Sequence, residues 1–306
     1  MILRKYRGEV SLLYCAVCWG STFFLVKGAL AVVSPFVLVS YRFLLSAVVI
    51  IPFLRGRSVL MGLRAGASLS AFVVVLFVSQ TLGLQWTTAT NSGFITGLFV
   101  LFVPVFMLLF WRRKPRAAEW VAIVLALTGL WVLTGGLRGF SRGDGMTLVA
   151  AAAYALHMLL TDRYVKANDT VVLAFHQFWI TGFFVLLIGV VTDASLRVTA
   201  MRGWLAVGFL ALFPTLSGFF AQMVGQRCVP PIRAALLLSL EPAFAAMFAC
   251  GFGGEALTWN AVFGGGMIVA ATILCELSRT APSAVSQAVG AVDPVVAMRS
   301  GSSREE

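Results

Sequence analysis

Residues 91–111 read NSGFITGLFVLFVPVFMLLFW, and RRKPR follows directly at 112–116. The first stretch carries no charged side chain. A helix of about 20 mostly apolar residues is long enough to cross the hydrocarbon core of a bilayer. Clustered Lys and Arg residues are typical of the loops that such helices leave on the cytoplasmic side. The stretch therefore predicts a transmembrane helix that ends at a basic loop.

The composition of the whole chain agrees with this interpretation. Of its 306 residues, 60% are apolar and only 11% are charged, and the mean hydropathy is +0.94. An average soluble domain is about 25% charged. So few charges cannot cover a soluble fold of this size without leaving large apolar patches. The composition excludes a soluble single-domain enzyme and favours an integral membrane protein.

Ten stretches of the chain are apolar enough to span a bilayer. Their approximate bounds are 9–31, 35–54, 66–86, 91–111, 118–137, 145–161, 170–192, 204–226, 232–253 and 258–277. Transmembrane β-strands are not an alternative, because these stretches are long and uniformly apolar instead of alternating with period two. The loops between them are too short for a soluble domain. We expect an all-α integral membrane protein with ten transmembrane helices and a disordered cytoplasmic tail at 279–306.

The N-terminus has a second interpretation, because Arg4, Lys5 and Arg7 precede an apolar run as in a signal peptide. Residues 29–31 even offer a cleavage site with small residues. The run is longer than an ordinary signal sequence, however, and Lys27 lies just before that site. We expect a first helix that is retained.

The basic residues predict the orientation of the helices. With the N-terminus inside, 17 of the 23 Lys and Arg residues fall on the cytoplasmic side, four fall outside, and Lys27 and Arg42 remain within spans. Such an excess is the pattern of the positive-inside rule. Both termini are therefore expected in the cytoplasm. The net charge of +11 is explained by topology, so nucleic-acid binding is not needed to account for it.

The two halves of the chain show weak internal similarity. When the sequence is aligned with itself at one constant shift, Trp19 falls on Tyr154 and the triplet 41–43 falls on 176–178. Near the ends of the halves a slightly longer shift places Pro104 on Pro242. The period equals five spans, and an odd number requires the second half to insert upside down. Inverted repeats of this kind are typical of secondary transporters, whose substrate site lies near the bilayer midplane.

Several short motifs carry a resemblance to a known family. They are Trp19-Gly20-Ser21-Thr22-Phe23 followed by Lys27; Pro35 with Arg42; Ser239-Leu240-Glu241-Pro242-Ala243 followed by Gly254-Glu255-Ala256-Leu257; and Gly264-Gly265-Gly266. In order and spacing the chain resembles the EamA-type transporters of the drug/metabolite transporter superfamily over about residues 9–277. One departure is that Val103 stands in the first half where the second half has Glu241.

The resemblance implies a fold of two inverted five-helix repeats, at 1–140 and 141–278. It also implies a central cavity surrounded by the first, third, fourth, sixth, eighth and ninth spans, with the fifth and tenth to one side. Members of the family export or import small organic solutes. We therefore expect a secondary transporter, an exporter of a metabolite, amino acid or drug-like compound, that works by alternating access.

Glu241 is the most informative polar residue, because polar groups inside a membrane normally face a cavity or a partner. It lies about nine residues into the ninth span, which is about 13 Å deep. It has two interpretations: a partner for a substrate ammonium or carrier of a proton, and a structural ion pair or hydrogen-bonded kink. Pro242 after it and Pro104 in the fourth span are expected to kink their helices.

Two basic residues also lie within spans. Arg42 is about 10 Å deep in the second span, at a depth compatible with Glu241 or with a substrate carboxylate. A structural role is favoured, because the second span is not expected to line the cavity. Lys27 lies near the outer end of the first span, where it either extends to the headgroups or serves transport.

Other polar and aromatic side chains fall on the spans expected around the cavity, and they suit a small polar ligand. They are Trp19, Gln80, Gln85, Asn91, Tyr154, His157, Gln222 and Gln226, with His176 and Gln177 ranked lower on the seventh span. Trp19 and Tyr154 are expected to face each other across the repeat axis. Packing between helices is the alternative role for each residue.

The chain has no Walker sequence, no HExxH and no Cys/His cluster with metal spacing. We therefore expect no catalytic residue, no metal and no cofactor, and transport that runs on a gradient such as that of protons, on substrate exchange, or passively. A membrane-embedded enzyme and a non-transporting scaffold are the alternatives. The usage of Arg and Ala fits a bacterial inner-membrane protein, which is expected to be a monomer or a homodimer in the lipid bilayer.

Overall fold

The computed structural model describes residues 6–136, 140–252 and 258–278. In this part of the chain ten helical stretches are long and apolar enough to cross a membrane, and there is no strand. This confirms the predicted all-α fold with ten transmembrane helices. The tail at 279–306, the motif at 254–257 and the basic residues Arg4 and Lys5 lie outside the described residues.

The elements follow the predicted spans in order, and several spans consist of more than one helix. The first five spans are α2 (Arg7–Gly20) with α3 (Thr22–Ala29), α4 (Pro35–Ile50) with η1 (Ile51–Leu54), η2 (Val59–Gly62) with α5 (Leu63–Gly83), α6 (Ala89–Gly97) with α7 (Phe99–Trp111), and α8 (Ala117–Thr134). The last five are α9 (Arg142–Ala167), α10 (Thr170–Val191), α11 (Met201–Leu210) with the π-helix η3 (Ala211–Gly218) and α12 (Phe219–Gln226), α13 (Pro231–Leu238) with α14 (Glu241–Phe252), and α15 (Trp259–Leu277).

The sixth span is longer than the predicted 145–161, because α9 covers 26 residues. Ser141 and Asp144 form a capping box that starts the helix before its apolar run. At the other end Lys166 bonds Asp162 one turn earlier, at 2.7 Å. Charged residues at both ends thus extend this helix beyond its apolar part.

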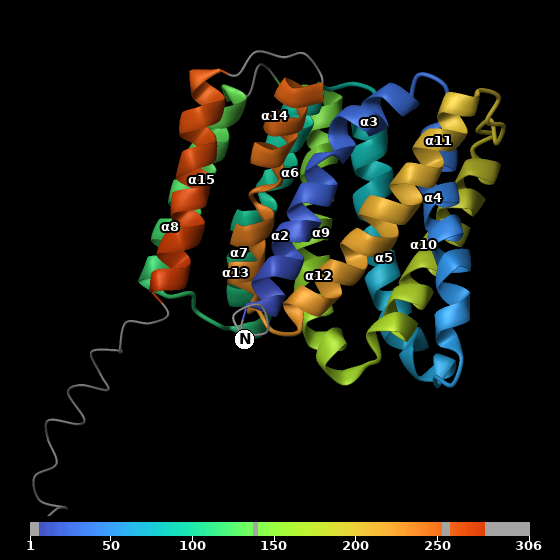
Figure 1. The fold of residues 1–306 in the computed structure, drawn as a ribbon, viewed down its shortest axis with the longest axis horizontal. Coiled ribbons are helices and arrows are strands. Elements are labelled where there is room, and N and C mark those ends of the chain that lie inside the picture. The colour runs from blue at the N-terminus through green and yellow to red at the C-terminus, as the bar shows by residue number, and fades with distance from the viewer. Residues whose placement is uncertain (1–5, 137–139, 253–257, 279–306) are drawn as a thin grey trace, which may run out of the picture.

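Helix α2 begins and the turn between α9 and α10 lies at one end of the bundle (Figure 1). Arg57, Arg233 and Arg227 bond residues in or beside these segments, so basic side chains gather at this end. We call it the basic end. Arg233 there pairs with Glu9 at 3.1 Å and with Glu276. Arg227 donates to the carbonyl of Val165 at 2.7 Å, which satisfies a backbone group in the last turn of α9. These bonds join the first, ninth and tenth spans to one another, and the sixth span to the eighth, at the basic end.

The fifth and tenth spans, α8 and α15, stand side by side at one edge of the bundle (Figure 1), as the family resemblance predicts. Glycines allow their close contact. A Cβ atom on Gly129 would lie 2.7 Å from the carbonyl oxygen of Gly264, and one on Gly264 would lie 2.5 Å from that of Gly129. Both positions therefore exclude any side chain.

Candidate functional site

A small central cavity lies between helices of both halves of the chain. Its lining residues are Trp19, Thr22, Arg42, Leu76, Phe77, Gln80, Thr96, Tyr154, Phe219 and Glu241. Its volume is about 40 Å³, which holds a few water molecules. Sites for drug-sized ligands are typically about 300–1,000 Å³. The helices must move apart before an organic solute fits here.

Glu241 reaches the cavity because the ninth span is broken just before it. Helix α13 ends at Leu238 and α14 begins at Glu241, so the carboxylate stands at a helix N-terminus, where negative charge is stabilised. Pro242 is the second residue of α14, a position where its missing N–H costs no helical hydrogen bond. The side chain is 7% exposed. Within the described residues its carboxylate accepts no hydrogen bond and makes no ion pair within 4.0 Å.

Gly20 brings the first span against this break. A Cβ atom on Gly20 would lie 2.8 Å from the carbonyl oxygen of Glu241 and 2.8 Å from Cβ of Phe244. The glycine of the Trp19-Gly20-Ser21 motif is therefore needed for the approach of α2 to α14. Trp19, one residue earlier, lines the same cavity as Glu241.

Arg42 lines the same cavity, although the second span was expected to stay outside it. Its Nε donates to Oγ1 of Thr215 at 2.7 Å, and its guanidinium lies 4.8 Å from the ring centroid of Phe77. Thr215 in turn donates to the carbonyl of Leu210 at 2.7 Å, a carbonyl near Pro214, which supplies no N–H. The long side chain of Arg42 thus reaches the cavity while α4 stays behind the π-helix.

Trp19 and Tyr154 face each other with ring centroids 5.6 Å apart, which confirms the predicted contact. Trp19 donates from Nε1 to the carbonyl of Pro214 at 2.8 Å and packs edge-on against Phe219. A Cβ atom on Gly218 would lie 2.8 Å from this Nε1, so the π-helix needs a glycine there. Trp19, Tyr154 and Phe219 all line the cavity, and we call these rings the aromatic floor.

Hydroxyl and amide groups complete the lining. Gln80 donates from Nε2 to Oγ1 of Thr96 at 2.9 Å, which joins α5 to α6. Thr22 bonds the carbonyl of Trp19 at 2.7 Å. The hydroxyl of Tyr154 is buried and has no hydrogen-bond partner within the described chain. The cavity therefore offers both a donor and several acceptors to a polar ligand.

Five of the predicted site residues line the cavity, namely Glu241, Trp19, Arg42, Gln80 and Tyr154. Three others lie toward the end opposite the basic end. Lys27 donates from Nζ to the carbonyl of Thr87 at 2.7 Å, Gln85 is exposed beyond the end of α5, and Asn91 is in the first turn of α6. They are not among the residues that line the cavity.

The other two predicted residues, His157 and Gln222, are buried on the basic side of the aromatic floor. Nε2 of His157 lies 3.1 Å from Oε1 of Gln177 on α10. Pro104 lies inside α7, and the break of the fourth span falls at Leu98. The sequence reasoning missed Phe77, Phe219 and Thr96, because aromatic rings and a single threonine on a span look like ordinary packing.

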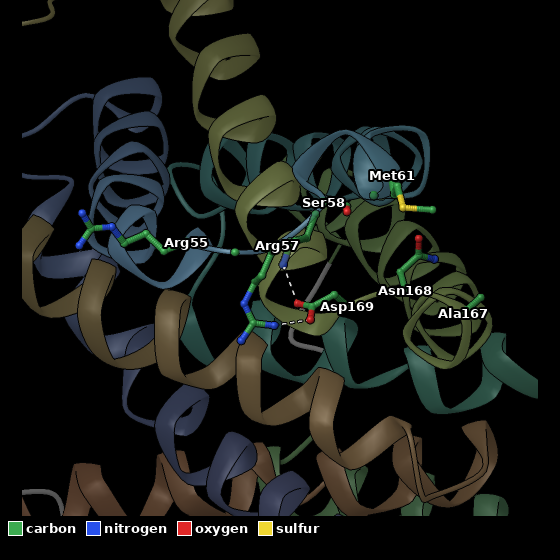
Figure 2. Close-up of a pocket in the computed structure, with 10 residues that line it drawn as sticks. Arg55, Arg57, Ser58, Met61, Ala167, Asn168 and Asp169 are labelled. Atoms are coloured by element: carbon green, nitrogen blue, oxygen red, sulfur yellow. Dashed lines mark hydrogen bonds and ion pairs between the residues drawn. The ribbon is translucent and has the colours of Figure 1, made fainter.

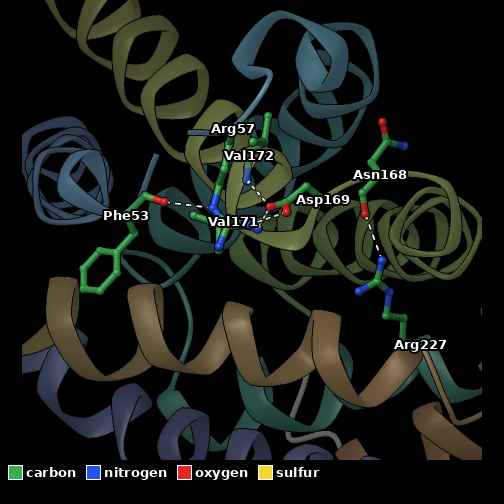
Figure 3. Close-up of polar contacts among 7 residues, drawn as sticks. All are labelled: Phe53, Arg57, Asn168, Asp169, Val171, Val172 and Arg227. Carbon is green, nitrogen blue, oxygen red and sulfur yellow. Dashed lines mark hydrogen bonds and ion pairs between the residues drawn. The ribbon is translucent and has the colours of Figure 1, made fainter. Parts of the chain in front are cut away.

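A second cavity, of about 600 Å³, lies at the basic end between the loop after η1 and the turn before α10 (Figure 2). Arg57 pairs with Asp169 across it, whereas Arg55 points away from that carboxylate. Arg57 also bonds the carbonyl of Phe53, and Arg227 bonds that of Asn168 (Figure 3). Because the Arg57–Asp169 pair is exposed, it contributes little to stability. This groove lies at the surface, and none of the predicted site residues lines it.

Comparison with known proteins identifies the family. Two stretches of the chain, residues 6–135 and 141–276, match the EamA-like transporter family. The chain belongs to the EamA-like transporter family. Among its relatives, an uncharacterized transporter of Archaeoglobus fulgidus is 30% identical, over 90% of this chain and 87% of that protein.

Two relatives of this EamA-family protein come from Escherichia coli K12. The uncharacterized inner membrane transporter YedA is 28% identical, over 86% of this chain and 88% of its own. The threonine/homoserine exporter RhtA is 27% identical, over 60% of this chain and 62% of its own. Family membership and ten apolar helices together make this chain a multi-pass membrane protein of a transporter family.

Proposed function

We propose that this EamA-family protein is a secondary transporter that exports a small zwitterionic organic solute, such as an amino acid, across the bacterial inner membrane. One observation carries the proposal. Glu241 and Arg42 are 7% and 3% exposed, line one cavity, and make no ion pair with each other within 4.0 Å in the described part of the chain. Arg42 bonds Thr215, but neither it nor Glu241 has an opposite charge beside it in the described chain, and a buried charge without one is costly. A solute with an ammonium and a carboxylate group compensates both charges at once.

The remaining lining fits the uncharged part of such a solute. Trp19, Phe77 and Phe219 offer aromatic faces, and Gln80 and Thr22 offer hydrogen bonds. A site built largely of apolar walls with a few placed polar groups is typical of small-molecule recognition. Alternating access supplies the motion, because the cavity of about 40 Å³ must open toward each side in turn.

The direction of transport and the orientation of the protein in the membrane rest on further observations. The positive-inside rule places the basic end in the cytoplasm. The names of YedA and RhtA support an inner-membrane location and export. The driving force is a proton gradient or exchange, with Glu241 as the group that carries a proton or holds the ammonium. An enzyme or a scaffold would bind a ligand here without moving it.

Counterflow into proteoliposomes tests the proposal. Vesicles of the purified protein are loaded with a neutral amino acid, an organic amine without a carboxylate, a carboxylate without an ammonium, or a sugar, and uptake of the labelled compound is measured. We expect uptake of the amino acid alone. Uptake of the amine alone would leave Arg42 without a role in recognition, and no uptake of any compound would contradict the proposal.

A further inference from the structure

Polar side chains are buried on the basic side of the aromatic floor, outside the central cavity. His157, Gln177, Gln222 and Gln226 are each 0% exposed. Both amide atoms of Gln222, Nδ1 of His157, Nε2 of Gln177 and Oε1 of Gln226 have no hydrogen-bond partner in the described chain. Leaving a buried polar group unpaired costs about 1–3 kcal/mol, so natural proteins seldom do so. Several such groups together call for a ligand or water.

The four side chains come from α9, α10 and α12, and α12 contacts both of the other helices. His157 on α9 reaches Gln177 on α10 at 3.1 Å, and its ring lies 5.7 Å from that of Phe219 on α12. Gln226 donates from Nε2 to the carbonyl of Met158 on α9 at 2.9 Å. Gln222 lies between Phe219 and Gln226 on one face of α12, since these residues are three and four positions apart. We call this region the inner junction.

The inner junction repeats the central cavity in the second half of the sequence. The shift that places Trp19 on Tyr154 also places Thr22 on His157 and Arg42 on Gln177. A second shift, of 142 residues and different from the one that pairs Pro104 with Pro242, places Phe77 on Phe219 and Gln80 on Gln222. Three polar residues of the cavity lining, Thr22, Arg42 and Gln80, thus have a buried residue of the inner junction as their partner.

Helix contacts support the same two shifts independently. A Cβ atom on Gly83 would lie 2.8 Å from the carbonyl oxygen of Gly143, so α5 touches the start of α9 there. A Cβ atom on Gly225 would lie 2.9 Å from the carbonyl oxygen of Gly8, so α12 touches the start of α2. The first shift takes Gly8 to Gly143, and the longer one takes Gly83 to Gly225. The same contact thus occurs once at each end of the bundle.

We propose that the inner junction is the closed counterpart of the central cavity, and that in the alternate state it opens toward the basic end and binds the polar groups of the solute. The inference rests on the proposed transport function. Helices α2 and α5 run away from the basic end, so Thr22 and Gln80 of the cavity lie farther from that end than Trp19 and Phe77. Helices α9 and α12 run toward it, so His157 and Gln222 of the junction lie nearer to it than Tyr154 and Phe219. When the junction opens, Gln177, Gln222 and His157 replace Arg42, Gln80 and Thr22 as contacts.

The replacement changes the chemistry of the site. Arg42 has a neutral amide, Gln177, as its counterpart. Among the described residues, Tyr154 stacks on His157 and interacts electrostatically with Cys15 and Glu241, and none of these side chains is a fixed positive charge. The junction therefore offers hydrogen bonds to a carboxylate in place of an ion pair. We expect the protein to bind the solute more weakly when it is open to the cytoplasmic side than when it is open to the opposite side. Weaker binding on the cytoplasmic side suits the release or capture of an abundant solute.

Cysteine labelling tests the proposal. The full-length protein has cysteines at 15, 18, 228, 250 and 275, which are replaced by alanine before Gln80→Cys, Gln222→Cys or Met223→Cys is introduced. A membrane-impermeant maleimide is added to sealed vesicles from either side. We expect Gln222→Cys to react only from the cytoplasmic side and Gln80→Cys only from the other. Met223 is the matched control, since it is adjacent and equally buried in the core.

We expect Gln222→Cys to be labelled at least about tenfold faster than Met223→Cys. The alternate state of a two-state protein is typically populated to about 0.1–10%, so the reagent can reach a residue that is exposed in that state. Equal rates for the two variants in a protein that still transports would overturn the inference and leave the proposed function intact. Two-sided labelling without counterflow of any tested solute would uphold the inference and overturn the proposed function.

Radical footprinting of the unmodified protein covers the case in which the cysteine replacements fail to fold. Met158, at the junction, and Met223, in the core, are both 0% exposed. Hydroxyl radicals formed from water oxidise methionines that have water beside them. We expect faster oxidation of Met158 than of Met223 in reconstituted protein. Equal oxidation of the two would mean that no water enters the junction, and the inference would fall.

Discussion

Trp19 and Tyr154 meet edge to face with ring centroids 5.6 Å apart, although one belongs to the first span and the other to the sixth. The two residues occupy equivalent positions in the two repeats of the sequence. Aromatic pairs in this geometry contribute about 0.5–1.5 kcal/mol beyond the area that they bury. Both rings belong to the aromatic floor of the central cavity.

The indole of Trp19 should matter through its hydrogen bond as well as its ring. Trp19→Phe removes the donor to the carbonyl of Pro214. The loss of this buried bond is expected to lower the free energy of unfolding by about 1–3 kcal/mol. Thermal unfolding in detergent measures the change. Trp86→Phe, at an exposed indole, is the control and should change stability by less than about 0.5 kcal/mol.

Glu241 carries the sharpest test of the site. Glu241→Gln keeps the shape of the side chain and removes its charge, so expression and folding should be unchanged. Counterflow should fall by about tenfold or more, because a hydrogen bond to a charged group is worth about 1.5–3 kcal/mol. Flux measured at acidic and at alkaline pH also reports proton carriage. Unchanged flux at every pH would exclude a role for Glu241 in transport.

Thr215 links Arg42 to the π-helix, so removal of its hydroxyl group should destabilise both the position of Arg42 and the π-helix. Thr215→Val keeps the shape of the side chain and deletes the bonds to Arg42 and to the carbonyl of Leu210. We expect the free energy of unfolding to fall by about 1–3 kcal/mol. Thr128→Val, which deletes only a bond within α8, should have a smaller effect in the same unfolding assay. Equal losses of stability in Thr215→Val and Thr128→Val would argue against a specific link between Arg42 and the π-helix.

Gly20 should tolerate no side chain. Gly20→Ala would place a Cβ atom 2.8 Å from the carbonyl oxygen of Glu241, which forces α2 and α14 apart. Overpacking of this kind costs about 1–3 kcal/mol. Gly28 has nothing within 4 Å of its Cβ position, so Gly28→Ala is the matched control and should be neutral or stabilising. Unfolding of the two variants in detergent compares them directly.

The orientation of the protein can be tested with tags. A reporter fused to either terminus should be accessible only from the cytoplasm, because the excess of basic residues retains the loops at the basic end on that side. Protease protection in sealed vesicles measures this. A periplasmic signal from one terminus would contradict an even number of crossings.

Much of the fold follows from composition and periodicity, because each span must be apolar for about 20 residues. Glu241 and Arg42 were recognised as site candidates because charged groups stand out against such a background. Phe77 and Phe219 did not stand out, since aromatic rings fit a lipid-facing or core position equally well. Neither did Thr215, because a π-helix places its residues out of the register that a sequence pattern assumes for an α-helix.

The structure differs from two expectations about the cavity lining, and each difference has a physical reason. The second span was expected to lie outside the cavity, but arginine is long enough for its guanidinium to reach the cavity from a helix in the next layer. Gln85 was assigned to the cavity from its span alone, whereas it lies beyond the last turn of α5. Position along a span therefore decides which polar residues line the cavity, and hydropathy defines that position only to within a few residues.

The small volume of the central cavity has a consequence for affinity. A space of about 40 Å³ cannot hold the solute until helices separate, so part of the binding energy is spent on breaking contacts between them. Measured affinity is then intrinsic affinity multiplied by the fraction of molecules already open. The apparent dissociation constant therefore depends on residues that do not contact the solute, such as Gly83 and Gly225 at the helix contacts, as well as on the residues that bind it.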